Sequence, residues 1–297
     1  NLKGKQLGNE VQPDTNFTRT YTNVFPTFYA SYQADSLGNH IMVFSFGRRI
    51  DRPFFQDLNP FISPLDKFTF YGGNPGLLPT YSNNFSLTHT YKNSINTTLS
   101  YGLTTDGINE TLEIREGIYY SRPGNISTNH TLSLSVDAST DITKWYRLNT
   151  YIELGHQIFE SKLYTEQLDT SGTYFAANVT NSFQLGKGWN ADVRGDYQSN
   201  IVYAQLLIKS FGTLNLGIQK KILNDKGSIK LSLSDILYTR RADGIINNLK
   251  DTDADWNSRL DTRSATIAFS YRFGKSTSNK SKYTGSGSDS EQRRVKG

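Results

Sequence analysis

The feature that most constrains this chain is an alternation of apolar and polar residues with a period of two, which returns in segment after segment. In the stretch 95–104, Leu99 and Tyr101 share one face, and Ser100 and Gly102 share the other. Successive side chains of a strand point to opposite faces, so the pattern predicts strands with one apolar and one polar face. The chain is therefore expected to be all-β.

The alternation predicts about eleven strands, joined by connections that are short and long in turn. The expected strands are 22–33, 40–49, 82–92, 95–106, 127–139, 146–159, 173–186, 189–199, 203–222, 228–239 and 258–273. Tight turns are expected at 35–39, 93–94, 140–143, 186–188 and 224–227, and longer connections at 50–81, 107–126, 160–172 and 240–257, with a shorter one near 200–202. Short turns at one end and long loops at the other are typical of an up-and-down antiparallel transmembrane β-barrel.

The lengths and faces of these segments also favour a membrane barrel. No apolar run approaches the roughly 20 residues of a membrane helix, so strands would have to do any spanning. The apolar bands cover about 9–11 residues, the length of a tilted membrane strand. The polar faces are rich enough in Ser, Thr, Asn, Gln, Asp and Arg to line a watery lumen. Aromatic residues near strand ends are expected to form the interfacial girdle, namely Tyr101, Trp189, Tyr197, Tyr271 and Phe273.

An odd number of strands has a consequence for closure. The first and last of eleven strands run in the same direction, whereas an antiparallel barrel closes with an even number. Eleven is half of the 22 strands of plugged outer-membrane transporters. The chain is thus predicted to be the C-terminal half of such a barrel, without the N-terminal plug and the other barrel half. Residues 1–20 would be a loop after a missing strand, 21–274 the barrel half, and 275–297 a disordered polar tail in the periplasm.

One stretch interrupts the regular strands, and it reads GRRIDRPFFQDLNPFISPLDKFTFYGGNPGLLPTYSNN from Gly47 to Asn84. It holds five of the eight prolines, so it cannot be an inner strand or a helix. It is also rich in aromatic residues, which a disordered linker lacks. We therefore expect an ordered functional loop, with the run from Gly72 to Pro75 forming a turn that requires unusual φ.

These residues carry a family resemblance. The runs that carry it are Phe46–Pro53, Asp57–Pro60, Gly73–Pro75 and Leu78–Pro79, together with Phe25–Pro26 and the terminal Ser270–Gly274. In this order they resemble TonB-dependent outer-membrane receptors, and more narrowly the outer-membrane β-barrel family common in Bacteroidetes-type bacteria. The resemblance covers nearly the whole chain apart from its tail.

The resemblance implies a function in transport. Such receptors bind a scarce solute at their extracellular loops, and a plug moves when a TonB-type energy-coupling complex pulls on it. The plug and the coupling segment would lie in the missing N-terminal region, and this chain would supply wall and loops in contact with outer-membrane lipid. The solute would be small, for example a siderophore, a vitamin, a glycan or a peptide, and the sequence does not choose among them.

The candidate ligand-binding residues lie where the densest charges meet the long loop. They are Arg48, Arg49, Asp51, Arg52, Phe70 and Tyr71. In the functional interpretation they form a mouth that attracts an anionic or polar ligand. The interpretation we favour is structural, with the arginines pairing with carboxylates and loop carbonyls to hold the loop shape.

Other functional classes find little support in the sequence. The four histidines lack the spacing of a zinc site, and there is no GxSxG, phosphate loop or dinucleotide fingerprint, so we expect no enzyme, metal or cofactor. A net charge of +5 that is spread along the chain predicts no nucleic-acid partner. Two alternatives stay open: a structural or adhesive barrel without transport, and a soluble secreted β-sheet module. The second predicts that Leu99, Leu134, Phe183 and Ile267 pack against another layer.

Overall fold

The computed structural model describes residues 2–6, 15–19, 22–115, 117–163, 166–247 and 254–273. In this part of the chain it contains nineteen strands and one short 3₁₀ helix, η1 (Gln56–Leu58). The strands are β1 (Leu2–Gln6), β2 (Thr15–Arg19), β3 (Thr27–Gln33), β4 (His40–Asp51), β5 (Ile62–Pro64), β6 (Thr69–Gly72), β7 (Thr80–Tyr91), β8 (Ile95–Arg115), β9 (Ile118–Thr143), β10 (Tyr146–Leu163), β11 (Glu166–Gly186), β12 (Trp189–Gln198), β13 (Ile201–Tyr203), β14 (Leu206–Ile208), β15 (Phe211–Ile222), β16 (Gly227–Ser234), β17 (Ala242–Ile246), β18 (Ala254–Ser258) and β19 (Ser264–Tyr271). Among the described residues, no helix is long and apolar enough to cross a membrane.

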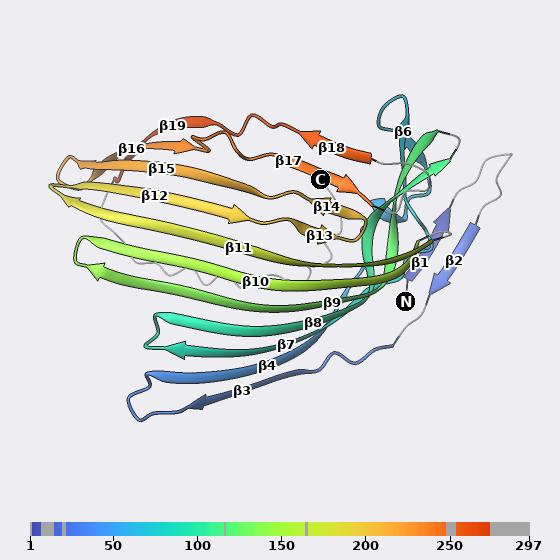
Figure 1. Ribbon diagram of the computed structural model, residues 1–297, viewed down its shortest axis with the longest axis horizontal. Coiled ribbons are helices and arrows are strands. Elements are labelled where there is room, and N and C mark those ends of the chain that lie inside the picture. Colours follow the sequence, from blue (N-terminus) through green and yellow to red (C-terminus); the bar gives the residue numbers. More distant parts are fainter. Residues whose placement is uncertain are drawn as a thin grey trace.

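Eleven strands form one curved antiparallel wall (Figure 1). Their order is β3-β4-β7-β8-β9-β10-β11-β12-β15-β16-β19, so each strand pairs with the next one along the chain once the short strands in the connections are set aside. Each of the eleven expected strands has its counterpart in this wall. The all-β, up-and-down prediction is confirmed.

All five short connections lie at one end of the wall, on the left in Figure 1. They are 34–39, 92–94, 144–145, 187–188 and 223–226. Four of them coincide with predicted turns, whereas the turn predicted at 140–143 is the end of β9 and the chain reverses at 144–145. Several of their residues have the left-handed backbone that tight hairpins require, including Lys187 between Gly186 and Gly188. The elaborate connections therefore all lie at the opposite end.

The two faces of the wall differ as the alternation predicts. Cross-strand pairing aligns one row of apolar side chains, Phe44, Leu87, Leu99, Leu134, Leu154 and Phe175, and beside it a row of small ones, Ser45, Ser86, Ser100, Ser133 and Gly155. Leu99 and Leu134 are each 48% exposed, and Ile267 is 76% exposed. Among the described residues no second layer covers the apolar face there, and Phe183 stacks on Tyr146 of the neighbouring strand in the same wall. The soluble-module alternative, in which these residues are packed, is wrong.

The polar face carries charges that neutralise one another. Arg194 and Asp196, two residues apart on β12, form an ion pair of 2.8 Å, and Lys230 on β16 approaches Asp192 at 3.8 Å. The carboxylate of Asp196 also accepts hydrogen bonds from the side chains of Asn178 and Thr213. This mutual pairing of alternate charges on β12 is typical of a polar inner wall.

Two expected loops are strands instead. The β8–β9 ladder continues to the pair Arg115↔Ile118, and the β10–β11 ladder continues to Leu163↔Glu166. The predicted loops at 107–126 and 160–172 were therefore wrong. Gly107, Pro123 and Gly124 favour turns when taken alone, but cross-strand hydrogen bonds outweigh this local preference.

The last two long connections form an upper continuation of the wall. A four-stranded sheet with the order β13-β14-β17-β18 lies beyond β12, β15, β16 and β19, toward the end opposite the short turns, and follows the same succession (Figure 1). Strands predicted as continuous at 203–222 and 228–239 are thus broken, and the loop predicted at 240–257 holds β17 and part of β18. The break after β16 centres on buried Asp235, whose carboxylate accepts hydrogen bonds from the backbone N–H groups of Thr239 and Arg240 and from the Thr262 hydroxyl.

The segment at the start of the chain contains regular structure where a loop was expected. Within 1–20, β1 and β2 form an antiparallel hairpin with the pairs Leu2↔Arg19 to Gln6↔Thr15. The predicted tail at 275–297 lies outside the described residues.

Candidate functional site

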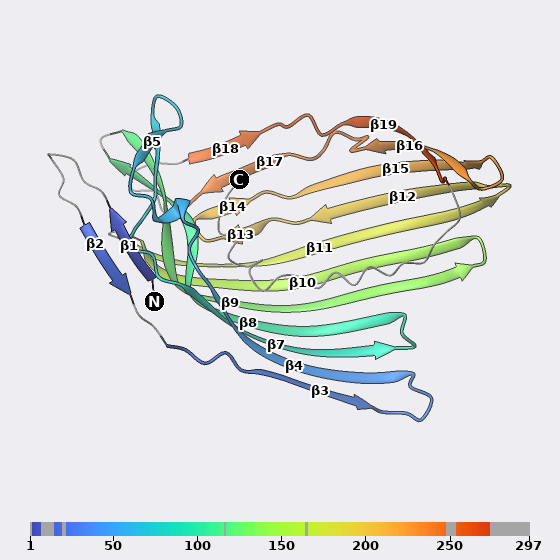
Figure 2. The same cartoon turned by 180° about the vertical axis from the view of Figure 1, so that it is seen from behind.

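The β8–β9 hairpin bends over the end of the wall that carries the elaborate connections (Figures 1 and 2). The β8–β9 ladder keeps its register from Thr105↔Thr128 to Gly107↔Ile126, but the pair at Asp106 between them is missing, and Asp106 has a φ of +54°. The carbonyl of Asp106 accepts hydrogen bonds from the Thr80 hydroxyl at 3.0 Å and the Asn125 side-chain amide at 2.6 Å. At this interruption the hairpin leaves the wall and crosses the end that carries the elaborate connections, which we call the mouth.

The proline-rich connection at 52–79 is an ordered loop that packs on the bent hairpin. Its β6 pairs in parallel with β9, beginning at Thr69↔Tyr119, and Phe70 stacks on Tyr120 with ring centroids 5.8 Å apart. Leu77 is buried. Asn125 of β9 holds the backbone of Leu78 through both its N–H and its carbonyl. Loop and hairpin therefore form one structured rim.

Gly73 and Asn74 shape the centre of this loop. A Cβ on Gly73 would lie 2.2 Å from the carbonyl oxygen of Asn59, so only glycine fits. Asn74 donates its backbone N–H to the Asp57 carbonyl at 2.6 Å and its side-chain N–H to the Pro123 carbonyl at 3.2 Å. Neither Gly72 nor Gly73 has a positive φ. The prediction of unusual φ was wrong, because close backbone approach is the actual constraint.

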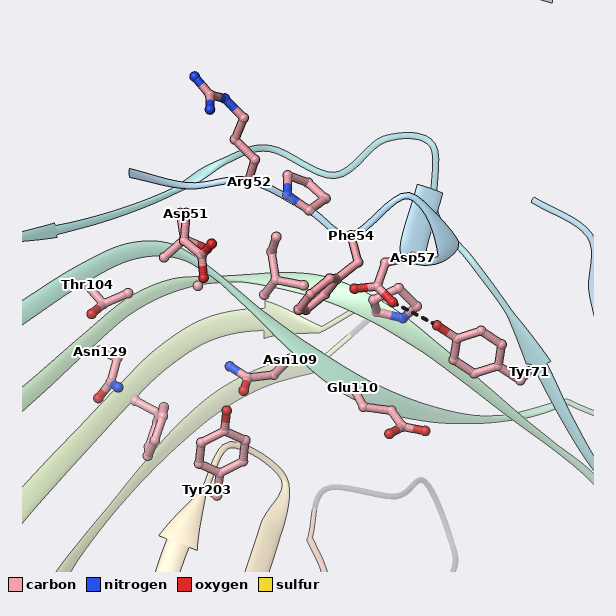
Figure 3. A pocket seen from close by; sticks show the side chains of 16 residues that line it. Asp51, Arg52, Phe54, Asp57, Tyr71, Thr104, Asn109, Glu110, Asn129 and Tyr203 are labelled. Atoms are coloured by element: carbon pink, nitrogen blue, oxygen red, sulfur yellow. Dashed lines mark hydrogen bonds between the residues drawn. The ribbon is translucent and has the colours of Figure 1, made fainter. Parts of the chain in front are cut away.

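Rim and wall enclose a pocket of about 440 Å³ (Figure 3). Its lining comes from the loop, the bent hairpin, the wall and the β13–β14 turn. The residues are Asp51, Arg52, Pro53, Phe54, Asp57, Tyr71, Thr80, Thr104, Gly107, Ile108, Asn109, Glu110, Pro123, Asn129, Phe159 and Tyr203. The volume is within the range of small-molecule sites.

Hydrogen bonds fix the loop side of the pocket. The hydroxyl of Tyr71 donates to the buried carboxylate of Asp57 at 3.2 Å. Burial raises the pKa of Tyr71 to about 12, and the negative charges of Asp57 and Glu110 act in the same direction. Glu110 in turn accepts a hydrogen bond from the Ser121 hydroxyl. Tyr71 is thus a neutral donor at physiological pH.

The floor of the pocket is the best-packed apolar part of the described chain. Phe159 is 1% exposed and contacts the edge of Tyr203, with 6.3 Å between ring centroids, while Ala204 and Val202 complete the cluster. The adjacent Gln205 accepts a hydrogen bond from the backbone N–H of Leu112 at 3.0 Å. The β13–β14 turn is therefore tied to the bent hairpin, and these two connections close the pocket from below.

The structure brings together three of the six predicted site residues. Asp51, Arg52 and Tyr71 line the pocket. Phe70 lies next to it in the stack on Tyr120. Arg48 lies over the ring of Tyr81 at 5.5 Å.

Arg49 is also outside the pocket, on the polar face of the wall. It donates to the Thr27 hydroxyl at 3.2 Å and lines a separate groove of about 600 Å³. The partners shown for Arg48 and Arg49 are an aromatic ring and a hydroxyl, whereas the sequence interpretation expected carboxylates and loop carbonyls.

Several pocket residues were not predicted. Phe54 and Asp57 are in the loop that the sequence singles out, whereas Asn109 and Glu110 come from the bent hairpin, Asn129 from the wall and Tyr203 from β13. Phe159 offered one usable signal: it follows Glu153, Gly155 and Gln157 on the polar parity of β10, where an aromatic residue is out of place.

The histidines show no metal site. The structure places His40 Nδ1 3.1 Å from His89 Nε2 and His130 Nδ1 2.8 Å from the Tyr101 hydroxyl. Within the described ranges, no three His, Cys, Asp or Glu side chains are grouped so that they could hold a metal ion.

Comparison with known proteins identifies the family. The signature of the outer membrane protein beta-barrel family matches residues 3–271, which is most of the chain. The chain belongs to that family. This membership and the exposed apolar face locate the barrel in the bacterial outer membrane, as the sequence predicted.

The fold of this outer-membrane barrel chain also resembles a solved receptor. It is similar to a variant of the ferric enterobactin receptor from Pseudomonas aeruginosa, crystallised in complex with enterobactin, with a TM-score of 0.53 and 11% sequence identity. The match covers 88% of this chain and 41% of the receptor chain, so this chain spans less than half the length of that protein. No curated protein matches the sequence.

Proposed function

We propose that this chain is the C-terminal half of the barrel of a TonB-dependent transporter, and that the mouth pocket is where a small solute is first bound. The observation that carries the proposal is the pocket itself, which three elaborate connections build at one end of the wall. The fold likeness to a receptor barrel, of which this chain covers 41%, supports it. A merely structural wall has no use for such a pocket.

The two edges of the wall support the half-barrel part of the proposal. β3 and β19 each have a free wall edge in the described chain, and both run from the mouth toward the short turns. They cannot close on each other in antiparallel fashion, and a closed antiparallel barrel would place an odd number of further strands between them. Eleven more strands would complete a barrel of about 22 strands, the size that encloses a plug.

The proposed mechanism assigns this chain the wall and the mouth. A solute from outside enters the pocket, and the plug then moves when the TonB-type energy-coupling complex pulls on it. The paired charges of the polar face, such as Arg194 with Asp196, would give the plug and the solute a wet surface along which to move. We also propose, from the family resemblance of the sequence, that the chain comes from a Bacteroidetes-type bacterium.

Energised uptake is the property to measure. Cells with and without the intact protein receive a defined mixture of small solutes, and mass spectrometry follows the loss of each solute from the medium. We expect at least one solute to disappear in a way that requires both the protein and the proton-motive force, so that a protonophore abolishes it. If no solute meets both conditions, the structural or adhesive alternative replaces this proposal.

A further inference from the structure

Two buried oxygen atoms in the mouth pocket lack a partner. They are the side-chain carbonyl oxygens of Asn109, on the bent hairpin, and Asn129, on the wall. Figure 3 shows Asn109 near the centre of the lining, between Phe54 and Tyr203. A buried amide oxygen without a hydrogen bond costs free energy, and a donor on a bound molecule removes that cost. Each of the two oxygen atoms could therefore accept a hydrogen bond from an N–H or O–H group of a bound molecule.

The charge of the lining has one predominant sign. Three carboxylates line the pocket, Asp51, Asp57 and Glu110, against one guanidinium, that of Arg52. In Figure 3 the guanidinium of Arg52 points away from the other lining side chains. A concave surface lined by one sign of charge concentrates solutes of the opposite sign. The pocket thus disfavours anions.

Aromatic side chains form a further part of the pocket lining. Phe54, Phe159 and Tyr203 line the same space, so the rings lie within one pocket of the carboxylates and the free amide oxygens. Apolar and aromatic walls with a few convergent polar groups are the usual make-up of a small-molecule site. Aromatic faces also attract cations through their negative quadrupole.

We propose that the pocket selects a cationic, amine-bearing small solute, whose ammonium N–H groups bind the carboxylates of Asp51 and Glu110 and the amide oxygens of Asn109 and Asn129. This inference rests on the proposed function, because it names the class of solute that the mouth takes. It runs against the anionic ligand that the arginine-rich sequence 48–52 suggests. The side chains of Arg48 and Arg49 lie outside the pocket, and three acidic ones line it.

Three matched probes test the charge preference. Tyramine, tyrosol and hydroxyphenylacetate carry an ammonium, a hydroxyl and a carboxylate on the same phenol scaffold. Binding to the intact protein in nanodiscs is measured by calorimetry at low salt. We expect tyramine to bind about tenfold or more tightly than tyrosol, with hydroxyphenylacetate weakest. If tyramine is not the tightest binder, or if no probe binds at millimolar concentration, the inference is overturned.

Two substitutions test which residues cause the preference for tyramine. Glu110 is exposed, so Glu110→Gln, a neutral isostere, should fold normally, and Asn109→Ala removes one free amide oxygen. Each substitution should weaken tyramine binding several-fold and affect tyrosol binding less. Asp66→Asn is the matched control, because it removes a carboxylate of the same rim outside the pocket lining, and asparagine keeps the oxygen that accepts from Phe68 and Thr69. An equal loss in the control would contradict the assignment. Energised uptake of an anionic solute would keep the proposed function and reject only this inference.

Discussion

Replacing Ile152 with arginine probes whether the apolar face of the wall meets lipid. Ile152 lies on β10, six residues after Tyr146, which belongs to an aromatic cluster with Trp145 and Phe183 beside the short turn. Six residues span about 20 Å along a strand, and a tilt of about 40° reduces this to about 15 Å of depth. The side chain thus lies near the middle of an apolar band about 25 Å tall.

An arginine at that depth should cost about 2–4 kcal/mol of unfolding free energy, the range for lipid-facing positions near the midplane of a barrel. The cross-strand neighbours of Ile152 are Val136 and Ala177, which offer no counter-charge. Urea titration of the intact protein in lipid vesicles measures the change, with tryptophan fluorescence as the signal.

Ser135→Arg is the control on the opposite face. Ser135 is the cross-strand partner of Glu153, whose carboxylate accepts from the hydroxyls of Tyr151 and Tyr174. An arginine there meets a carboxylate on the polar face, so we expect a change below about 1 kcal/mol. Equal losses for the two variants, or a larger loss for Ser135→Arg, would refute the assignment of the faces.

Four further outcomes are expected. Ile267→Arg on β19 should impair assembly by about 2–4 kcal/mol if that exposed side chain faces lipid, as heat-modified gel mobility would show. Single cysteines at Ser133 and Thr266 should react with a water-soluble maleimide and those at Leu134 and Ile267 should not, and the reverse pattern would contradict a watery lumen; the chain has no cysteine of its own. Gly73→Ala should open the loop to limited proteolysis because of its 2.2 Å approach to Asn59, whereas Gly195→Ala, with nothing within 4 Å, should not. The pKa of Tyr71 is raised above its ordinary value of 10 to about 12, so the unfolded loop loses the hydroxyl proton at a lower pH than the folded loop does. The stability of the loop should therefore fall as the pH rises from 10 to 12. Hydrogen exchange measures this fall, and Tyr71→Phe should abolish it.

The wall could be predicted from the sequence because a lipid-facing strand must repeat its pattern at every second residue. Leu99 and Ser100 differ so clearly that the faces and the number of strands follow from them and their neighbours. Four of the five short turns were equally clear, since residues such as Gly186 and Gly188 permit left-handed backbone.

The mouth could not be predicted in the same way. The extension of β8 and β9 beyond Asp106 leaves the wall, so no lipid imposes alternation, and Pro123 and Gly124 read as a turn. The pocket joins Asp57 of the loop, Asn109 of the bent hairpin, Tyr203 of β13 and Phe159 of the wall strand β10, which lie far apart in the sequence. Local signals therefore identified the loop without identifying what it faces.

The parallel pairing of β6 with β9 has a consequence for the order of folding. Thr69 and its partner Tyr119 are separated by the whole β7–β8 hairpin, whereas wall strands pair with their immediate successors. Closing the longer segment costs more chain entropy, so local hairpins should form first and β6 should dock late. A barrel that is still inserting into the membrane would then have its wall strands paired before the loop has docked on the bent hairpin. Under the proposed function, capture of solute would begin only once assembly is complete.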